Sequence, residues 1–253
     1  MIAIIGGSGL TNLATLHVVR REVFRTPYGE PSGALTFGTL AGSEVVFLAR
    51  HGYGHTIPPH EVNYRANLWA LKQAGGRNVI AVASVGGVRA DCGPGVLMVP
   101  DQIIDYTHDR RHTYFEGPEA PVTHIDFTWP YSAAMRARLL NAARSAKEPV
   151  IDGGVYGVTQ GPRLETTAEI IRMERDGCDL VGMTGMPEAA LARELGLEYA
   201  CLAVVVNHAA GKGESAQAIS VEHLGVVMKQ SMSRVQRILE CAVKSALIPG
   251  PTP

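Results

Sequence analysis

The sequence has almost no net charge and few cysteines, and each scarcity excludes classes of protein. Its 253 residues carry 23 basic and 24 acidic side chains, so the formal net charge is −1. A protein dedicated to nucleic acid would show a basic excess, so we expect no nucleic-acid partner. No C-x-x-C pair occurs, which predicts free thiols in a reducing compartment and no disulfide framework or metal centre. The cysteines are Cys92, Cys178, Cys201 and Cys241.

Long hydrophobic runs are also absent. No apolar run approaches the roughly 18 residues that mark a transmembrane helix, so no membrane partner is expected. The apolar start, Met1–Gly7, is short and has no basic residues, which predicts a strand and not a signal peptide. We therefore expect a cytoplasmic protein. Its hydrophobic share of 46% also excludes a disordered chain.

Glycine, by contrast, is abundant: there are 28 residues, well above the usual share of about 7%. Several glycines follow short apolar runs that are rich in β-branched residues, a pattern typical of buried strands that end in tight turns. The predicted strands are Ile2–Ile5, Leu35–Phe37, Val45–Ala49, Val79–Val85, Val96–Val99, Val155–Thr159 and Ala200–Asn207.

Helical patterns alternate with these strands. The predicted helices are Val62–Ala74, Ser132–Ala146, Thr166–Asp176, Pro187–Leu195 and Ser220–Leu247. This alternation predicts an α/β fold, a single domain over residues 1–248 whose mixed, twisted central sheet is flanked by helices. Residues 249–253 are expected to form a C-terminal tail. The longest irregular segment, Asp105–Pro130, is expected to be a functional loop.

Familiar binding motifs fail when they are tested. The phosphate-binding pattern that ends in Gly-Lys-Ser/Thr has Val206 where its first glycine belongs and Gly213 in place of the hydroxyl residue. Asn12 stands where the dinucleotide fingerprint needs its last glycine, which argues against a nicotinamide oxidoreductase. Glycines separate His51 from His55, so their spacing does not favour a zinc site on a helix.

Six clusters of polar residues and glycine remain; most follow a predicted strand, and the one at Thr184 lies just before a predicted helix. Open α/β sheets bind ligands at the carboxyl ends of their strands. Glycines free backbone N–H groups to approach an anion, and an arginine can clamp phosphate oxygens in bidentate fashion. The clusters centre on Ser8, Arg50 with His51, Ser84, Thr159–Glu169, Thr184 and Asn207.

These clusters, taken in order, resemble the trimeric purine nucleoside phosphorylase family, and within it the methylthioadenosine phosphorylase branch. The resemblance runs from Ile4 to about Leu224. It implies a nucleoside phosphorylase-like fold, a homotrimer, and phosphorolysis in which inorganic phosphate attacks C1′ of a purine nucleoside. It implies no metal or organic cofactor, since phosphate is a co-substrate. The motifs are Arg50–Gly52 with His55, Val62–Asn67, Gln160–Arg163 with Ala168–Glu169, and Gly182–Thr184 with Pro187–Glu188.

The resemblance also implies roles for individual residues. His55 and Met183 would contact the sugar, and Leu164 would stack on the base where the family often has phenylalanine. Val221 and Leu224 would line the pocket for the 5′ substituent, together with His124 from a neighbouring subunit; the role of His223 stays open. The implied phosphate ligands are Ser8, Arg50, His51, Ser84 and Thr184.

The informative departure from the family pattern is at Asn207, which would be the catalytic contact to the base. Adenine-specific members end this strand in Asp-x-Asp, whereas this sequence has Asn207, His208 and Ala209. An amide can donate to N7 and can accept or donate at O6 of a 6-oxopurine, while Ala209 removes an acceptor for a 6-amino group. The base is therefore expected to be hypoxanthine.

Val221 and Leu224 are apolar, and an apolar pocket favours a methylthio group at the 5′ position of the sugar. The expected reaction is phosphorolysis of S-methyl-5′-thioinosine to hypoxanthine and 5-methylthioribose 1-phosphate. The alternatives are a methylthioadenosine phosphorylase, a general 6-oxopurine nucleoside phosphorylase, and a nucleoside-binding protein without catalysis.

Overall fold

The computed structural model describes residues 1–118 and 120–244. Its α-helices are α1 (Tyr64–Gln73), α2 (Ala133–Ser145), α3 (Thr167–Arg175), α4 (Gly185–Glu194) and α5 (Val221–Lys244). Its strands are β1 (Ile2–Gly6), β2 (His17–Glu22), β3 (Leu35–Leu40), β4 (Ser43–Ala49), β5 (Asn78–Gly87), β6 (Leu97–Val99), β7 (Gln102–Asp105), β8 (Ile151–Asp152), β9 (Val155–Val158), β10 (Leu180–Gly182) and β11 (Glu198–His208). The expected tail, 249–253, and the last residues of the expected final helix lie outside the described residues.

Helix starts follow from polar caps in the sequence. Asn63 caps α1 by accepting a hydrogen bond from the backbone N–H of Ala66, and Ser132 caps α2 in the same way. Before α3, Thr166 and Glu169 form a reciprocal capping box. Each cap satisfies N–H groups that the first helical turn leaves unpaired, so these helices begin within two residues of the predicted positions.

The strands of the described residues form one mixed sheet in the order β2-β3-β4-β1-β5-β10-β9-β7, with β11 paired to β5 and β6, and β8 paired to β6. Strand β1 is parallel to both β4 and β5, and β5 is parallel to β11 over nearly its whole length. The β3–β4 hairpin and the β5–β10 pair are antiparallel. The predicted α/β class with a mixed central sheet is confirmed.

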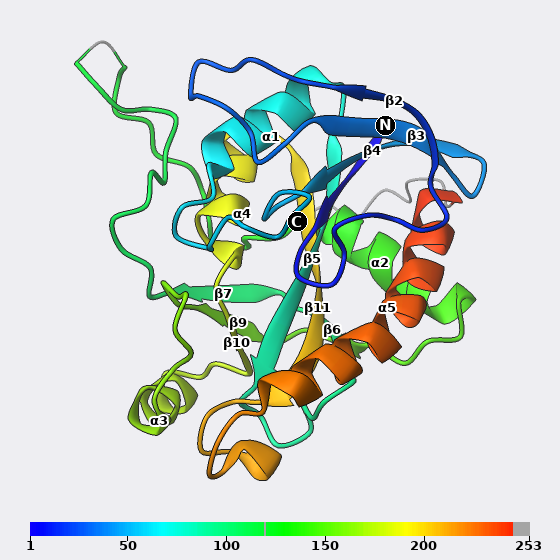
Figure 1. The fold of residues 1–253 in the computed structure, drawn as a ribbon. Helices are drawn as coiled ribbons and strands as arrows, with labels where there is room; N and C mark the ends of the chain where they lie inside the picture. Colours follow the sequence, from blue (N-terminus) through cyan, green and yellow to red (C-terminus); the bar gives the residue numbers. More distant parts are fainter. Residues whose placement is uncertain (119, 245–253) are drawn as a thin grey trace.

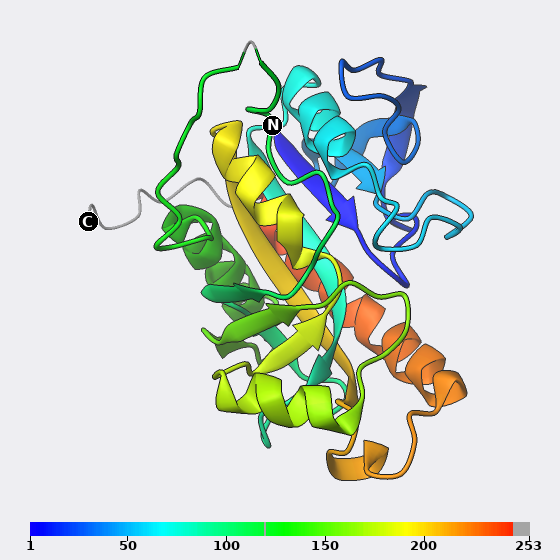
Figure 2. The same ribbon diagram turned by 90° about the vertical axis from the view of Figure 1, so that its left-hand side faces the viewer.

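Alternate residues of the central strands face two separate hydrophobic clusters. Ala3 and Ile5 of β1 pack in the cluster that includes Leu68 of α1 and Leu191 of α4. Ile4 packs in the cluster that includes residues of α2 and α5. Figure 1 shows α1 and α4 on one side of the sheet and α2 and α5 on the other, and Figure 2 shows α4 in front of the strands with α5 behind. The central strands are buried on both faces, as their continuous apolar runs predict.

The sequence patterns missed four strands, which are short or polar. β2 is exposed along its whole length, so no alternation of apolar and polar residues identifies it. β7, β8 and β10 are two to four residues long and are held by pairing with neighbours that lie far away in the sequence. Helix α4 begins at Gly185 with a kink at Met186, so its regular part starts at Pro187 as predicted.

The segment between β7 and α2 contains no helix or strand in its described part, and Figure 1 shows it as the long green loop beside α4. It corresponds to the irregular segment expected from the sequence. Within the described ranges, no helix is long and apolar enough to cross a membrane.

Candidate active site

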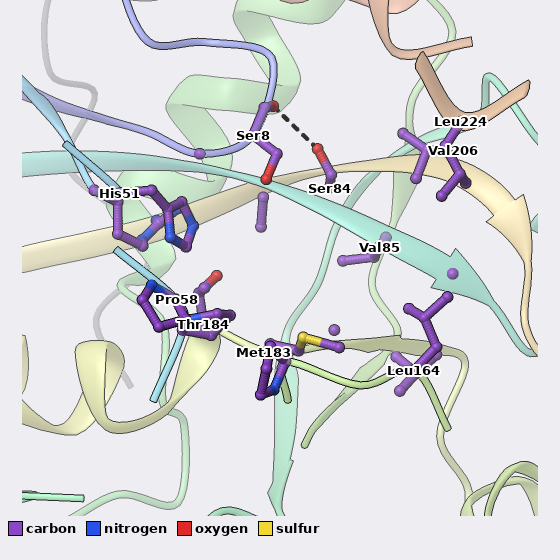
Figure 3. A pocket seen from close by; sticks show the side chains of 18 of the residues that line it. Ser8, His51, Pro58, Ser84, Val85, Leu164, Met183, Thr184, Val206 and Leu224 are labelled. Atoms are coloured by element: carbon purple, nitrogen blue, oxygen red, sulfur yellow. Dashed lines mark hydrogen bonds between the residues drawn. The ribbon is translucent and has the colours of Figure 1, made fainter. Parts of the chain in front are cut away.

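A cavity of about 370 Å³ lies where the carboxyl ends of several strands meet helix α5. Residues that follow or end β1, β4, β5, β10 and β11 line it, although these segments are far apart in the sequence. In Figure 3, His51 and Thr184 lie on one side of the view, Leu164, Val206 and Leu224 lie on the other, and Met183 lies between them. The cavity therefore has two ends with different chemistry.

The topology explains this convergence. Four of the contributing strands, β1, β4, β5 and β11, are mutually parallel neighbours, so they end at one edge of the sheet. Strand β10 runs antiparallel to β5 with Val181 opposite Gly86. Its carboxyl end therefore returns toward Ser84, which brings Met183 and Thr184 to the same cavity.

Arg50 lines the cavity beside His51 and is only 1% exposed. We call this end of the cavity the anion end. Its Nε and Nη2 donate to the two carboxylate oxygens of Glu188 at 2.7 and 2.8 Å, and its Nη1 donates to the Val82 carbonyl at 3.0 Å. Burial disfavours the charged guanidinium, but Glu188 outweighs this effect and raises the pKa of Arg50. Two guanidinium N–H groups remain for an anion in the cavity.

Gly7 makes room for that guanidinium. A Cβ atom at Gly7 would lie 2.9 Å from Nη1 of Arg50 and 2.6 Å from the Val82 carbonyl oxygen. Ser8 follows, and its carbonyl accepts a hydrogen bond from the Ser84 hydroxyl at 3.2 Å, drawn as a dashed line in Figure 3. The turn after β1 is thus tied to β5, with both hydroxyl residues at the cavity wall.

His51 lines the same end and is 6% exposed. Burial, together with the positive charge of Arg50, lowers its pKa to about 4, so the ring is neutral near pH 7. Its Nδ1 lies 2.8 Å from the Ile57 carbonyl, which can only accept, so Nδ1 carries the proton and Nε2 is left as an acceptor. A neutral His51 of this tautomer can accept a hydrogen bond from a protonated phosphate oxygen.

Thr184 and His55 complete the polar surround. Thr184 is buried and lines the cavity just before the kinked start of α4. His55 has a left-handed backbone with φ of 51°, and its Nε2 lies 3.4 Å from the Ser8 hydroxyl. All five predicted phosphate ligands and both predicted sugar contacts, His55 and Met183, line this one cavity.

A β-bulge shapes the opposite end. The register of β11 against β5 shifts between Val205 and Asn207, and as a result both Val206 and Asn207 line the cavity. In a regular strand these neighbours would face opposite sides of the sheet. The Asn207 Nδ2 donates to the carbonyl of His208 at 2.6 Å, which leaves one N–H and the amide oxygen for a ligand. Ala209 also lines this end, as predicted.

Glu165 is a cavity residue that the sequence reasoning did not single out. It follows Leu164, the predicted stacking residue, which is 43% exposed at the cavity mouth. Burial raises the pKa of the Glu165 carboxyl. The Thr159 hydroxyl, which donates to it at 2.6 Å, acts in the opposite direction but does not outweigh burial. The signal was present, since Glu165 lies inside the Thr159–Glu169 cluster, but spacing alone does not show which carboxylate faces inward.

Helix α5 supplies an apolar wall. Leu224 and Met228, one turn apart, both line the cavity, and a Cβ at Gly9 would lie 2.3 Å from the Met228 sulfur. Sequence reasoning named Leu224 but missed Met228, although the spacing of four residues on a helix places both on one face. The side chains of Val221 and His223 lie outside what the structure describes.

His124 is exposed in the segment before α2 and does not line the cavity of its own chain. Its predicted contact requires a second subunit. Sequence reasoning also missed the role of Glu188 as the partner of Arg50, although buried charges in proteins are generally paired. Among the described residues, no group of three or more His, Cys, Asp or Glu side chains is arranged to hold a metal ion.

Comparison with known proteins gives a consistent set of relatives. The model of the phosphorylase superfamily matches residues 1–244. The chain is 56% identical over 237 residues to a probable S-methyl-5′-thioinosine phosphorylase of Pseudomonas syringae pv. tomato, covering 94% of this chain and 96% of the relative. It is 43% identical over 250 residues to a probable 6-oxopurine nucleoside phosphorylase of Thermococcus kodakarensis, covering 96% and 91%.

The fold also matches solved structures. A methylthioadenosine phosphorylase from Schistosoma mansoni in complex with adenine superposes with a TM-score of 0.91. The two sequences are 34% identical, and the match covers 96% of this chain and 90% of the other.

Removing the acidic partner of the buried ion pair should destabilise the fold more than removing that of an exposed pair. We expect Glu188→Gln to lower the free energy of unfolding by about 3–5 kcal/mol, because Arg50 would remain buried without a counter-charge. The control is Glu22→Gln, which breaks the exposed pair with Arg20 and should cost less than about 1 kcal/mol. Urea unfolding measures both variants, and a similar small loss in each would show that the buried pair does not stabilise the fold.

His51 predicts a stability change with pH. Its pKa is about 4 in the folded protein against an ordinary 6.5, so the unfolded chain binds more protons between these values. Stability is therefore at its full value above pH 6.5 and falls as the pH decreases toward 4. Between pH 7 and 5 the wild type should lose about 1–2 kcal/mol more than His51→Gln. The control His17→Gln alters an exposed histidine and should keep the wild-type slope; identical slopes in all three proteins would contradict the assignment.

Proposed function

The chain belongs to the phosphorylase superfamily, and on that premise we propose that it cleaves S-methyl-5′-thioinosine with inorganic phosphate. The products are hypoxanthine and 5-methylthioribose 1-phosphate. The observation that carries this proposal is that the amide of Asn207 and the carboxyl of Glu165 line the same cavity as Arg50. The names of relatives such as the Pseudomonas syringae protein support the same substrate.

The end of the cavity at Leu164 and Val206, which we call the base end, suits a 6-oxopurine. Hypoxanthine carries a hydrogen on N1, which the carboxylate of Glu165 can accept, and it has acceptors at O6 and N7 for the free N–H of Asn207. Adenine would turn the lone pair of N1 toward the carboxylate, and Ala209 offers its 6-amino group no side-chain acceptor. A buried polar group left unpaired or repelled costs enough to reject the wrong base.

The apolar wall suits the methylthio group. Leu224, Met228 and Val206 present hydrocarbon and thioether surface, with no charged group among them. Burying a methylthio group there contributes roughly 1–3 kcal/mol, whereas a 5′-hydroxyl would lose hydrogen bonds with water. His55 and Met183, which also line the cavity, are proposed to hold the sugar.

Catalysis by this arrangement depends on orientation and electrostatics. Phosphate held by Arg50, Thr184 and the other residues of the anion end attacks C1′; a C–O bond forms as the bond from C1′ to N9 breaks. The negative phosphate stabilises the positive charge that develops on the sugar. The departing base keeps the electron pair of the broken bond and takes a proton from water at N7, while the new sugar phosphate releases the proton of the attacking phosphate to water. The amide oxygen of Asn207 can then accept a hydrogen bond from the new N–H. Fixing both reactants removes most of the entropic cost of their meeting.

This chemistry needs no metal or organic cofactor, and we propose that phosphate is the only further reactant. We place the enzyme in the cytoplasm, where its four free cysteines would stay reduced. A general 6-oxopurine nucleoside phosphorylase is the second candidate, because Glu165 and Asn207 would read the base regardless of the 5′ group. The Thermococcus kodakarensis relative bears that name.

We further propose a homotrimer in which His124 of one subunit reaches the 5′ end of its neighbour's cavity. Sedimentation velocity should then give a trimer, and a monomer would contradict the proposal. Mixing subunits of His124→Ala and Asn207→Ala tests the shared site, because a mixed trimer contains complete sites built from one subunit of each kind. The mixture, refolded together, should exceed the summed activity of the two variants; activity no greater than that sum would place His124 outside the neighbour's site.

Substrate choice is the direct test of the reaction. Phosphorolysis of methylthioinosine, methylthioadenosine and inosine is followed by release of the base, with phosphate omitted as a control. We expect kcat/KM for methylthioinosine to exceed that for methylthioadenosine by about 10²-fold or more, and that for inosine by about 10–100-fold. A preference for adenine nucleosides would contradict the base assignment, and a preference for inosine would contradict the apolar wall.

The base assignment is tested separately by Glu165→Gln. An amide can donate to N1 of adenine as well as accept from N1–H of hypoxanthine, so the preference for methylthioinosine should fall by about 10-fold or more. The matched control is Glu174→Gln in α3, which alters an exposed carboxylate paired with Lys212. An unchanged preference in Glu165→Gln would remove Glu165 from base recognition.

A further inference from the structure

Arg110 is a buried cation that the mechanism above does not use. It belongs to the irregular segment between β7 and α2 and is only 8% exposed. Its Nε donates to the side-chain oxygen of Gln160 at 3.0 Å, and its Nη2 donates to the carbonyls of Thr159 and Gln160 at 3.2 and 2.8 Å. Its Nη1 donates to the carbonyls of Met183 and Met186 at 2.8 and 2.6 Å. Each of the five N–H groups therefore has one of these acceptors within reach, and Nη1 also lies 3.4 Å from the Tyr64 hydroxyl.

The five nearer acceptors lie in two segments that each contribute residues to the cavity wall. Residues 159–160 follow β9 and lead directly into Leu164 and Glu165 at the base end. Residues 183–186 follow β10 and include Met183 and Thr184, which line the sugar region and the anion end. One planar guanidinium thus bridges the loop proposed to read the base and the segment proposed to hold sugar and phosphate.

A second contact joins the same two segments. Gly161 has a left-handed backbone with φ of 62°, and a Cβ there would lie 2.4 Å from the sulfur of Met183. The side chain of Met183 therefore packs directly on the backbone of the base-end loop. Arg110 hydrogen-bonds to the same two segments.

The partners of Arg110 are unusual for a buried cation. Arg50 is balanced by Glu188, whereas Arg110 makes no ion pair within residues 1–118 and 120–244 and bonds only neutral oxygens. Burying a charge without a counter-ion is costly, and carbonyl dipoles offset only part of that cost. A lysine could not replace it, because three donors on one nitrogen cannot reach five acceptors in a plane.

We propose that Arg110 is a positioning residue of the phosphorolysis. It sets the spacing between the base-end loop, 159–165, and the segment 183–186, so that a nucleoside held by the first lies in line with phosphate held at the second. This inference rests on the proposed phosphorolysis but not on which nucleoside is preferred. Because Arg110 acts between the two half-sites, its loss affects the reaction of the joined substrates more than the binding of each part.

The test compares Arg110→Lys and Arg110→Met with the same changes at Arg111, the next residue. The Arg111 side chain is 76% exposed and forms only a distant pair with Glu116, at 3.5 Å, so it is a matched control. Steady-state kinetics give kcat and KM for nucleoside and phosphate, calorimetry gives the binding of hypoxanthine alone and of phosphate alone, and urea unfolding gives stability.

We expect kcat of Arg110→Lys to fall about 10²-fold, since misalignment of reactants by about an ångström has effects of that size. Binding of hypoxanthine alone and phosphate alone should change less than about 3-fold, and the Arg111 variants should match the wild type. A folded Arg110→Lys with wild-type kcat overturns the proposal. The proposal is also overturned if the affinity for hypoxanthine alone or for phosphate alone falls as much as kcat does. Failure of both Arg110 variants to fold would likewise overturn it, because Arg110 would then be structural only.

The wild-type enzyme, assayed with each nucleoside, is the reference for these ratios. An error in the proposed base or 5′ group appears in the wild type itself, whereas an error in the role of Arg110 appears only in the ratio of variant to wild type. The two failures are therefore distinguishable.

Discussion

The buried ion pair between Arg50 and Glu188 is the interaction on which the cavity depends. Both side chains are 1% exposed, and the Tyr199 hydroxyl donates to the same carboxylate at 2.8 Å. The pair therefore joins the end of β4, helix α4 and strand β11, three elements that the chain order separates. Because a buried charge without its partner is costly, the fold holds these elements in one geometry. That geometry places the guanidinium of Arg50 at the cavity wall, next to Gly7.

The arrangement of charges at the cavity makes the proposed phosphate site compatible with a net charge of −1. Glu188 cancels the charge of Arg50, and His51 is neutral because its pKa is about 4. The anion end therefore relies on directed N–H and O–H groups, without an excess of positive charge. Phosphate held in this way keeps most of its negative charge, which is what a developing positive charge on the sugar would require.

Many strand ends and helix starts could be predicted, because the residues that mark them lie within a short stretch of sequence. Apolar runs ending at Ile5, Ala49 and Asn207 locate three strand ends to within one residue, and capping residues such as Ser132 identify helix starts. Other features have no local signal. β10 is three residues long and exists through its pairing with β5 and β9. Glu165 and Glu169 look equivalent in sequence, yet only Glu165 lines the cavity. Arg110 lies in an irregular segment whose sequence does not indicate that its side chain is buried.

The sequence by itself determined the α/β class, the family resemblance and the residue types at the strand ends, among them the amide of Asn207 and the methyl group of Ala209. These are properties of short segments, set by hydrophobic periodicity, turn residues and side-chain chemistry. Only the tertiary structure decided which polar groups share one cavity, because that depends on the order and direction of strands that are distant in the chain. The antiparallel β10 returns Thr184 toward Ser84, and the bulge at Val206 lets Asn207 face the same space. Neither effect has a counterpart in any local pattern, since strand pairing is satisfied between segments and not within them.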